Sequence, residues 1–149
     1  MNTGTDTALG GRVERSPLTA ALAGVDVLLV LTFVVLGEFG HFGVTATALA
    51  RAPGTAAPFL LGWVLVAPLA GVYAPDARRS VRSAAVRTAA AWVGAVAVGQ
   101  SLRATAAFPG DLAPAFVVVS LLVGLALLLP WRLLVAGRLA PASARGGAA

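Results

Sequence analysis

Apolar residues of this chain fall into four long runs, and most of the charged residues lie in the segments between and around them. Each run has roughly the 20 residues that an α-helix needs to cross the hydrocarbon core of a bilayer. The runs lack the polar face that a helix of a soluble bundle presents to water. The pattern therefore predicts four membrane-spanning helices, at roughly 18–37, 56–73, 84–103 and 114–134.

Composition supports a membrane protein over a soluble one. Of the 149 residues, 58% are hydrophobic and only 11% are charged, whereas a soluble domain has about 25% charged residues. So short a chain leaves a large fraction of its surface exposed, so it cannot hide this much apolar surface from water. The predicted fold class is an all-α bundle of four transmembrane helices.

The basic residues predict how the bundle is oriented. All eleven are arginines, and with four spans both termini and the middle loop share one side of the membrane. Nine arginines fall on that side: Arg12, Arg15, Arg78, Arg79, Arg82, Arg87, Arg132, Arg138 and Arg145. Because positive residues concentrate in cytoplasmic segments, both termini are predicted to be cytoplasmic, in a multi-pass protein of the plasma membrane. The arginines thus serve orientation, and nucleic acid is not expected as a partner.

The runs divide the chain into a membrane domain at 18–134 and two tails, 1–17 and 135–149, that are predicted to be disordered and cytoplasmic. The first run is longer than the apolar core of a signal peptide, so it is predicted to be an uncleaved span. The connection at 38–53 is expected to hold a short interfacial helix. Trp63 and Tyr73 are expected near the membrane interfaces, where amphipathic rings gather.

Asp26 is an acid inside the first span, about 12 Å along a helix that rises 1.5 Å per residue. A charged group in hydrocarbon is costly, so the carboxyl should face the bundle interior, where Arg87 or Arg132 can serve as its counter-charge. Two interpretations stay open. The carboxylate handles protons or ions, or it belongs to a structural pair that locks helices together.

A second polar group is expected at the opposite, outer face. It comprises Glu38, His41, Arg51, Gln100 and Arg103. Glu38 and His41 have the E-x-x-H spacing of di-iron bundles, but such sites need a second motif and further carboxylates, so neither a metal site nor a cofactor is predicted. No Ser/His/Asp constellation is evident, so no catalytic residue is assigned. The cluster either forms a site or is a plain solvated rim.

Small residues recur every four positions in the third span, at Ala91, Ala95 and Gly99. Such a stripe lets helices approach closely in lipid. It predicts a contact through which two copies of the chain form a homodimer.

Several of these features together resemble one known family. They are Asp26, Gly37 with His41, the block T-A-A-P-F-L-L-G-W at 55–63, Trp92 with Gly99 and Arg103, and A-F-V-V-V at 115–119. They resemble the domain of unknown function 3054 family, small multi-pass membrane proteins of bacteria and archaea, over most of 18–134. The resemblance implies no activity. It marks Pro58, Phe59 and Gly62 as a family motif, and Asp26, His41 and Arg103 as further positions to test.

Two classes of function follow. The first is a small non-enzymatic membrane protein, either a transport or permeation component or a structural partner. The alternative is a membrane enzyme or ligand-binding protein that uses His41, Glu38 and Arg103 at the outer face. A polar cavity that reaches Asp26 would favour transport, whereas a pocket that gathers the other three residues would favour ligand binding or catalysis.

Overall fold

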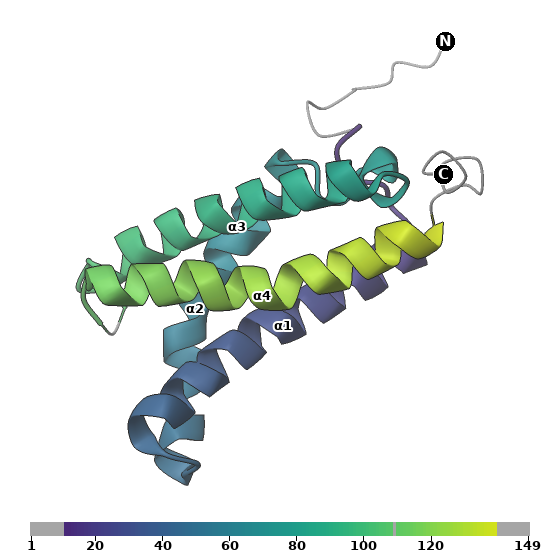
Figure 1. The fold of residues 1–149 in the computed structure, drawn as a ribbon. Coiled ribbons are helices and arrows are strands. Elements are labelled where there is room, and N and C mark those ends of the chain that lie inside the picture. Colours follow the sequence, from purple (N-terminus) through teal and green to yellow (C-terminus); the bar gives the residue numbers. More distant parts are fainter. Residues whose placement is uncertain (1–10, 109, 140–149) are drawn as a thin grey trace.

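A computed structural model of the chain describes residues 11–108 and 110–139. Its elements are α1 (Pro17–Phe42), α2 (Ala46–Leu69), the short 3₁₀ helix η1 (Pro75–Arg78), α3 (Val81–Arg103) and α4 (Pro114–Leu139). The four long helices run up and down, so the first turn of α1 and the last turn of α4 lie at the same end of the bundle (Figure 1). All four are long and apolar enough to cross a membrane, with mean hydropathies between 1.2 and 2.4. The predicted four-helix membrane bundle is confirmed for this part of the chain.

The first helical hairpin is tighter than predicted. α1 continues to Phe42 and α2 begins at Ala46, so the connection is three residues long and the expected interfacial helix is the first part of α2. Gly43 turns the chain with a φ of +68°, which suits a residue without a Cβ. The Thr45 hydroxyl then accepts a hydrogen bond from the Ala48 N–H at 3.2 Å and caps α2.

The segments next to the membrane domain are more ordered than predicted where the structure describes them. The Glu14 N–H donates to the Tyr73 carbonyl at 3.1 Å, and the Glu14 side chain pairs with Arg78. At the other end, 135–139 belong to α4 and not to a tail. The rest of the two predicted tails, 1–10 and 140–149, lies outside the described residues.

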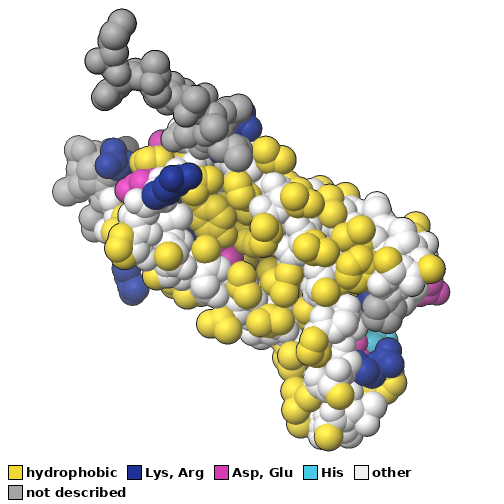
Figure 2. All heavy atoms as spheres, turned by 180° about the vertical axis from the view of Figure 1, so that it is seen from behind, with side chains coloured by type: hydrophobic (Ala, Val, Ile, Leu, Met, Phe, Trp, Pro, Cys, Tyr) yellow, Lys and Arg dark blue, Asp and Glu magenta, His cyan; other side chains and the backbone are white. Residues whose placement is uncertain are grey.

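Charged side chains gather mainly at the two ends of the bundle, while hydrophobic side chains cover most of the face seen in Figure 2. One end, hereafter the basic end, carries Arg12, Arg15, Arg78, Arg79, Arg82, Arg87, Arg132 and Arg138. The other end, hereafter the arginine-poor end, carries Arg51 and Arg103. This is the distribution on which the predicted orientation rests; the assignment of the basic end to the cytoplasm stays a prediction.

The small-residue stripe of α3 faces α2 of the same chain. A Cβ atom at Gly62 would lie 2.4 Å from the Ala95 carbonyl oxygen, so glycine is needed for this close approach. Ala91 and Ala95 are 0% exposed, and Gly99 is buried against Phe59. The prediction that this stripe is the contact of a homodimer is therefore wrong, since the stripe residues are buried in the contact with α2 of the same chain. The homodimer itself stays a prediction, and its contact would lie elsewhere.

Aromatic side chains fill the middle of the bundle. The Phe33 ring lies edge-on to Phe59 and Trp92, with centroid distances of 5.4 and 5.7 Å, and Trp63 lies 6.1 Å from Trp92. The Trp92 indole fits only because position 124 is glycine, where a Cβ would come within 2.1 Å of the ring. This aromatic core, defined as Phe33, Phe59, Trp63 and Trp92, separates the two polar regions described next.

Candidate functional site

Asp26 lies at the centre of a buried polar cluster in the half of the bundle nearer the basic end. Its carboxylate pairs with the Arg132 guanidinium from α4, with Nε 3.1 Å from Oδ1. The Tyr73 hydroxyl donates to Oδ2 at 2.8 Å and accepts from the Trp63 indole N–H at 3.1 Å. Asp26 is 0% exposed and Arg132 only 4%. We call Asp26, Arg132 and Tyr73 the buried cluster, and Trp63 is the member of the aromatic core that borders it.

Local sequence explains how Tyr73 reaches this position. α2 ends in a Schellman turn at Gly71, whose φ is +70°, with the Val72 N–H bonded to the Ala67 carbonyl and the Gly71 N–H to the Pro68 carbonyl. The turn directs Tyr73 back into the bundle, where it is only 8% exposed. Trp63 is 1% exposed. The expectation that both rings lie at the membrane interfaces is therefore wrong.

The geometry favours the structural interpretation of Asp26. A charge inside a bundle is tolerated when an opposite charge and further hydrogen bonds satisfy it, and Asp26 has all of these. Of the two predicted counter-charges, Arg132 is the partner, whereas Arg87 pairs with Asp76 and the Gly71 carbonyl. The cavity that borders Arg132 measures about 10 Å³, too small for more than a water molecule.

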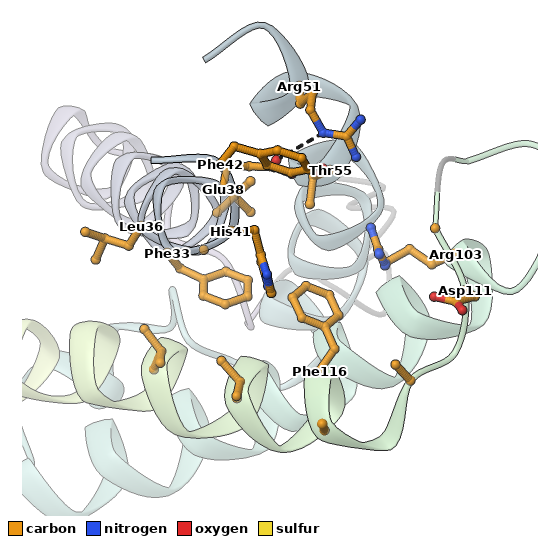
Figure 3. A pocket seen from close by; sticks show the side chains of 17 residues that line it. Phe33, Leu36, Glu38, His41, Phe42, Arg51, Thr55, Arg103, Asp111 and Phe116 are labelled. Atoms are coloured by element: carbon orange, nitrogen blue, oxygen red, sulfur yellow. Dashed lines mark hydrogen bonds and ion pairs between the residues drawn. The ribbon is translucent and has the colours of Figure 1, made fainter. Parts of the chain in front are cut away.

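A much larger cavity, of about 810 Å³, opens at the arginine-poor end between α1 and α4, and we call it the α1–α4 pocket (Figure 3). Its polar lining comes from Glu38, His41, Arg51, Thr55, Arg103 and Asp111. Its apolar lining includes Phe33, Val34, Leu36, Phe42, Phe116, Val119 and Val123. The volume is in the range of pockets that hold drug-sized molecules. Asp26 is not among the residues that line it.

Glu38 is fixed by two donors from α2. The Thr55 hydroxyl donates to Oε1 at 2.6 Å, and Arg51 Nε donates to Oε2 at 3.3 Å. The carboxylate is thus held against the pocket wall, and its negative charge is partly neutralised there. It is 7% exposed, while the Arg51 side chain is 51% exposed at the mouth.

Each arginine of the pocket is stacked on a phenylalanine of a neighbouring helix. The Arg103 guanidinium carbon lies 4.7 Å from the centre of the Phe116 ring, and that of Arg51 lies 4.7 Å from the Phe42 ring. Such cation–π contacts orient the guanidinium planes. The two positive groups approach the pocket from α2 and α3, and His41 points into it from α1 (Figure 3).

The structure brings together four of the five residues predicted for the outer cluster. Gln100 does not line the pocket; it is 3% exposed, and its side-chain amide lies 3.4 Å from the Ser120 hydroxyl inside the bundle. Gln100 lies about one helical turn deeper along α3 than Arg103, where the bundle is closed. The family motif, Pro58, Phe59 and Gly62, also lies elsewhere, buried in the packing of α2 against α3.

Most of the pocket lining was not predicted, and Phe42, Thr55 and Phe116 are the members that contact its charged groups. Phe42 and Phe116 are apolar, and hydropathy does not separate a pocket wall from a lipid-facing side chain. Thr55 lies one position before the second predicted span, and its polarity was the available signal. Within the described residues, no three His, Cys, Asp or Glu side chains come together as metal ligands would.

Comparison with known proteins gives one match. The model of the family described as "Protein of unknown function (DUF3054)" matches residues 23–135, which include the buried cluster and every residue that lines the α1–α4 pocket. No curated protein and no solved structure matches the chain. Since the matched segment covers well over half of the sequence, the chain belongs to the DUF3054 family.

Proposed function

We propose that the protein binds a small molecule in the α1–α4 pocket, from the outer side of the plasma membrane. The observation that carries this proposal is the pocket itself, a volume of about 810 Å³ that gathers Glu38, His41 and Arg103. Convergent polar groups in a largely apolar cavity are the usual form of a ligand site. The outward direction rests on the arginine distribution, with both termini in the cytoplasm.

Binding is supported over transport by what lies between the two polar regions. The aromatic core occupies the space between the buried cluster and the pocket, and Phe59, Trp63 and Trp92 are each at most 1% exposed. Asp26 is held by Arg132 and Tyr73 on the far side of this core. A permeation path would have to part these rings and separate a buried ion pair, which is strongly unfavourable.

Binding is also supported over catalysis. The carboxylate best placed to act as a base, Glu38, already accepts from Thr55 and Arg51. Both of its oxygens are therefore already engaged by donors of the protein itself. A non-enzymatic binding protein thus accounts for the pocket without a catalytic base.

The test is whether the protein retains a bound molecule when it is extracted from its own membrane. Full-length protein is released from native membranes into a mass spectrometer, and an adduct of reproducible mass is expected. Val119→Trp fills the pocket and should remove the adduct. Leu122→Trp, which places the same ring on the lipid-facing surface of α4 at a residue outside the pocket lining, should keep it. An adduct that Val119→Trp leaves unchanged, or none in the unmodified protein, contradicts the proposal.

A further inference from the structure

The α1–α4 pocket is open towards the lipid as well as towards the membrane surface. Leu36 of α1 and Val119 of α4 both line it, and they are 52% and 47% exposed. α1 and α4 make the least extensive contact of any neighbouring pair of long helices in the described chain, so little packing closes the space between them. Because these surfaces lie within membrane-spanning helices, the side opening faces the acyl chains of the bilayer.

The whole pocket, with its polar and apolar lining together, is nearly as long as one bilayer leaflet is thick. Its lining residues on α4 extend from Ala115 to Val123, about 12 Å along the helix, and those on α1 from Phe33 to Phe42, about 14 Å. Half of the hydrocarbon core is about 15 Å thick. The floor of the pocket is the Phe33 ring, which belongs to the aromatic core. A hydrocarbon chain of one leaflet can therefore move sideways into the apolar part of the pocket and stay at the same depth in the membrane.

The polar part of the pocket lies at the membrane surface and offers donors to an anion. Arg51 uses its Nε for Glu38, and no further hydrogen bond of its guanidinium is found within the described residues. Arg103 lies across the pocket on Phe116, and His41 points in from α1. The charge of Glu38 is partly neutralised by its ion pair with Arg51, and Asp111 on the exposed rim is a second opposing charge. Guanidinium groups bind carboxylate and phosphate through paired N–H donors.

From these features we infer that the ligand is a single-chain anionic amphiphile that enters sideways from the outer leaflet. Its carboxylate or phosphate head binds Arg51 and Arg103, and its hydrocarbon chain lies between α1 and α4 on Phe33. This inference rests on the proposed function, because it specifies the chemical class of molecule that the same pocket binds. One chain is specified because the apolar lining comes mainly from one pair of helices, α1 and α4.

The experiment uses full-length protein in phosphatidylcholine nanodiscs and a dodecyl phosphate that carries a photoreactive diazirine in its chain. After illumination, the labelled peptides are located by mass spectrometry. Labelling is expected on 33–42 and 115–123. Unlabelled dodecyl phosphate and laurate should compete for it, whereas dodecyltrimethylammonium and inorganic phosphate should not.

Charge variants identify the head-group site. Arg103→Gln and Arg51→Gln should each weaken competition by dodecyl phosphate about tenfold, as expected for the loss of one charge-assisted contact. Arg103→Lys should recover part of the loss. Asp111→Asn should strengthen competition, because it removes the opposing charge at the rim.

The outcomes separate this inference from the proposed function. Equal competition by the cationic amphiphile overturns the anionic head. Competition by inorganic phosphate alone overturns the hydrocarbon chain, while binding in the pocket stands. Labelling that no competitor reduces and that spreads over all lipid-facing helices overturns the inference, and the adduct carried from native membranes then decides whether the pocket binds another class of molecule.

Discussion

The two polar regions of this bundle contain the same kinds of groups and differ in how they are packed. In the buried cluster, Asp26 and Arg132 are at most 4% exposed and share Tyr73 as a further partner. In the α1–α4 pocket, Glu38 is nearly as buried, but its partner Arg51 is half exposed beside a cavity. The pair of Asp26 and Arg132 thus closes the interface between α1 and α4 in the half nearer the basic end. The pair of Glu38 and Arg51 leaves this interface open at the arginine-poor end.

The difference follows from which helices each pair joins. Asp26 and Arg132 lie on α1 and α4, so their ion pair draws these two helices together. Glu38 pairs with Arg51 and Thr55, which both lie on α2, so nothing in this group links α1 to α4. α1 therefore stays with α2 at the arginine-poor end, and the space beside α4 becomes the pocket.

The largest expected effect comes from removing one partner of the buried cluster. Arg132→Met leaves Asp26 without its counter-charge and should lower the free energy of unfolding by about 3–5 kcal/mol. The double variant Asp26→Leu with Arg132→Met should recover most of this loss, because no unpaired charge is left. Unfolding in mixed micelles, followed by circular dichroism, measures both. A single variant as stable as the unmodified protein would show that this pair does not hold the helices.

Removal of the Tyr73 hydroxyl tests the same cluster more gently. Tyr73→Phe deletes the donor to Asp26 and leaves the Trp63 indole N–H without its acceptor. A loss of about 2 kcal/mol is expected, since a buried polar group is left unsatisfied. The same micelle titration measures it. Unchanged stability would mean that this hydroxyl is not part of the network.

Two glycines compare the packed and the open parts of the bundle directly. Gly62→Ala would force α2 from α3 at Ala95 and should cost about 1–3 kcal/mol. Gly37→Ala is the matched control, because a Cβ there meets nothing within 4 Å and the residue lines the pocket. It should be neutral or add up to about 1 kcal/mol of stability through its better helix propensity. Equal losses at both positions would mean that α1 is packed as tightly as α2.

The smallest effect is expected at the pocket mouth. Arg51→Gln removes a half-exposed ion pair with Glu38 and should change stability by less than about 1 kcal/mol. The quantity to compare is the loss in free energy of unfolding, measured for Arg51→Gln and for Arg132→Met under the same conditions. A loss as large as that of Arg132→Met would show that the pocket is a structural element.

The sequence predicts the helices well and their mutual rotation poorly. Run length identified four spans, and a charge within a span identified Asp26 and left Arg87 and Arg132 as its possible partners, of which Arg132 is the one found. In lipid every face of a helix is apolar, so hydropathy does not tell which face meets a neighbour. The α3 stripe was therefore assigned to a second copy although it packs on α2, and Tyr73 was placed at an interface although a glycine turn directs it inward.

The same limit applies to the pocket. Glu38, His41, Arg51 and Arg103 were predicted to share one face because their positions along the chain put them at one end of the bundle. Gln100 was included by the same reasoning, yet it lies about one turn deeper along α3 and is buried in the core. The cavity itself depends on the separation of α1 from α4, which no residue pattern along either helix expresses.

The most direct measurement asks two questions together: whether the two ends of the bundle face opposite sides of the membrane, and whether the pocket is open at the outer end. The chain has no cysteine, so single thiols can be introduced as Thr55→Cys in the pocket and Arg79→Cys at the basic end. In intact cells, a membrane-impermeant maleimide should label Thr55→Cys and should label Arg79→Cys only after permeabilisation. Labelling of Arg79→Cys from outside would contradict the orientation, and a Thr55→Cys thiol that reacts in neither condition would contradict the open pocket.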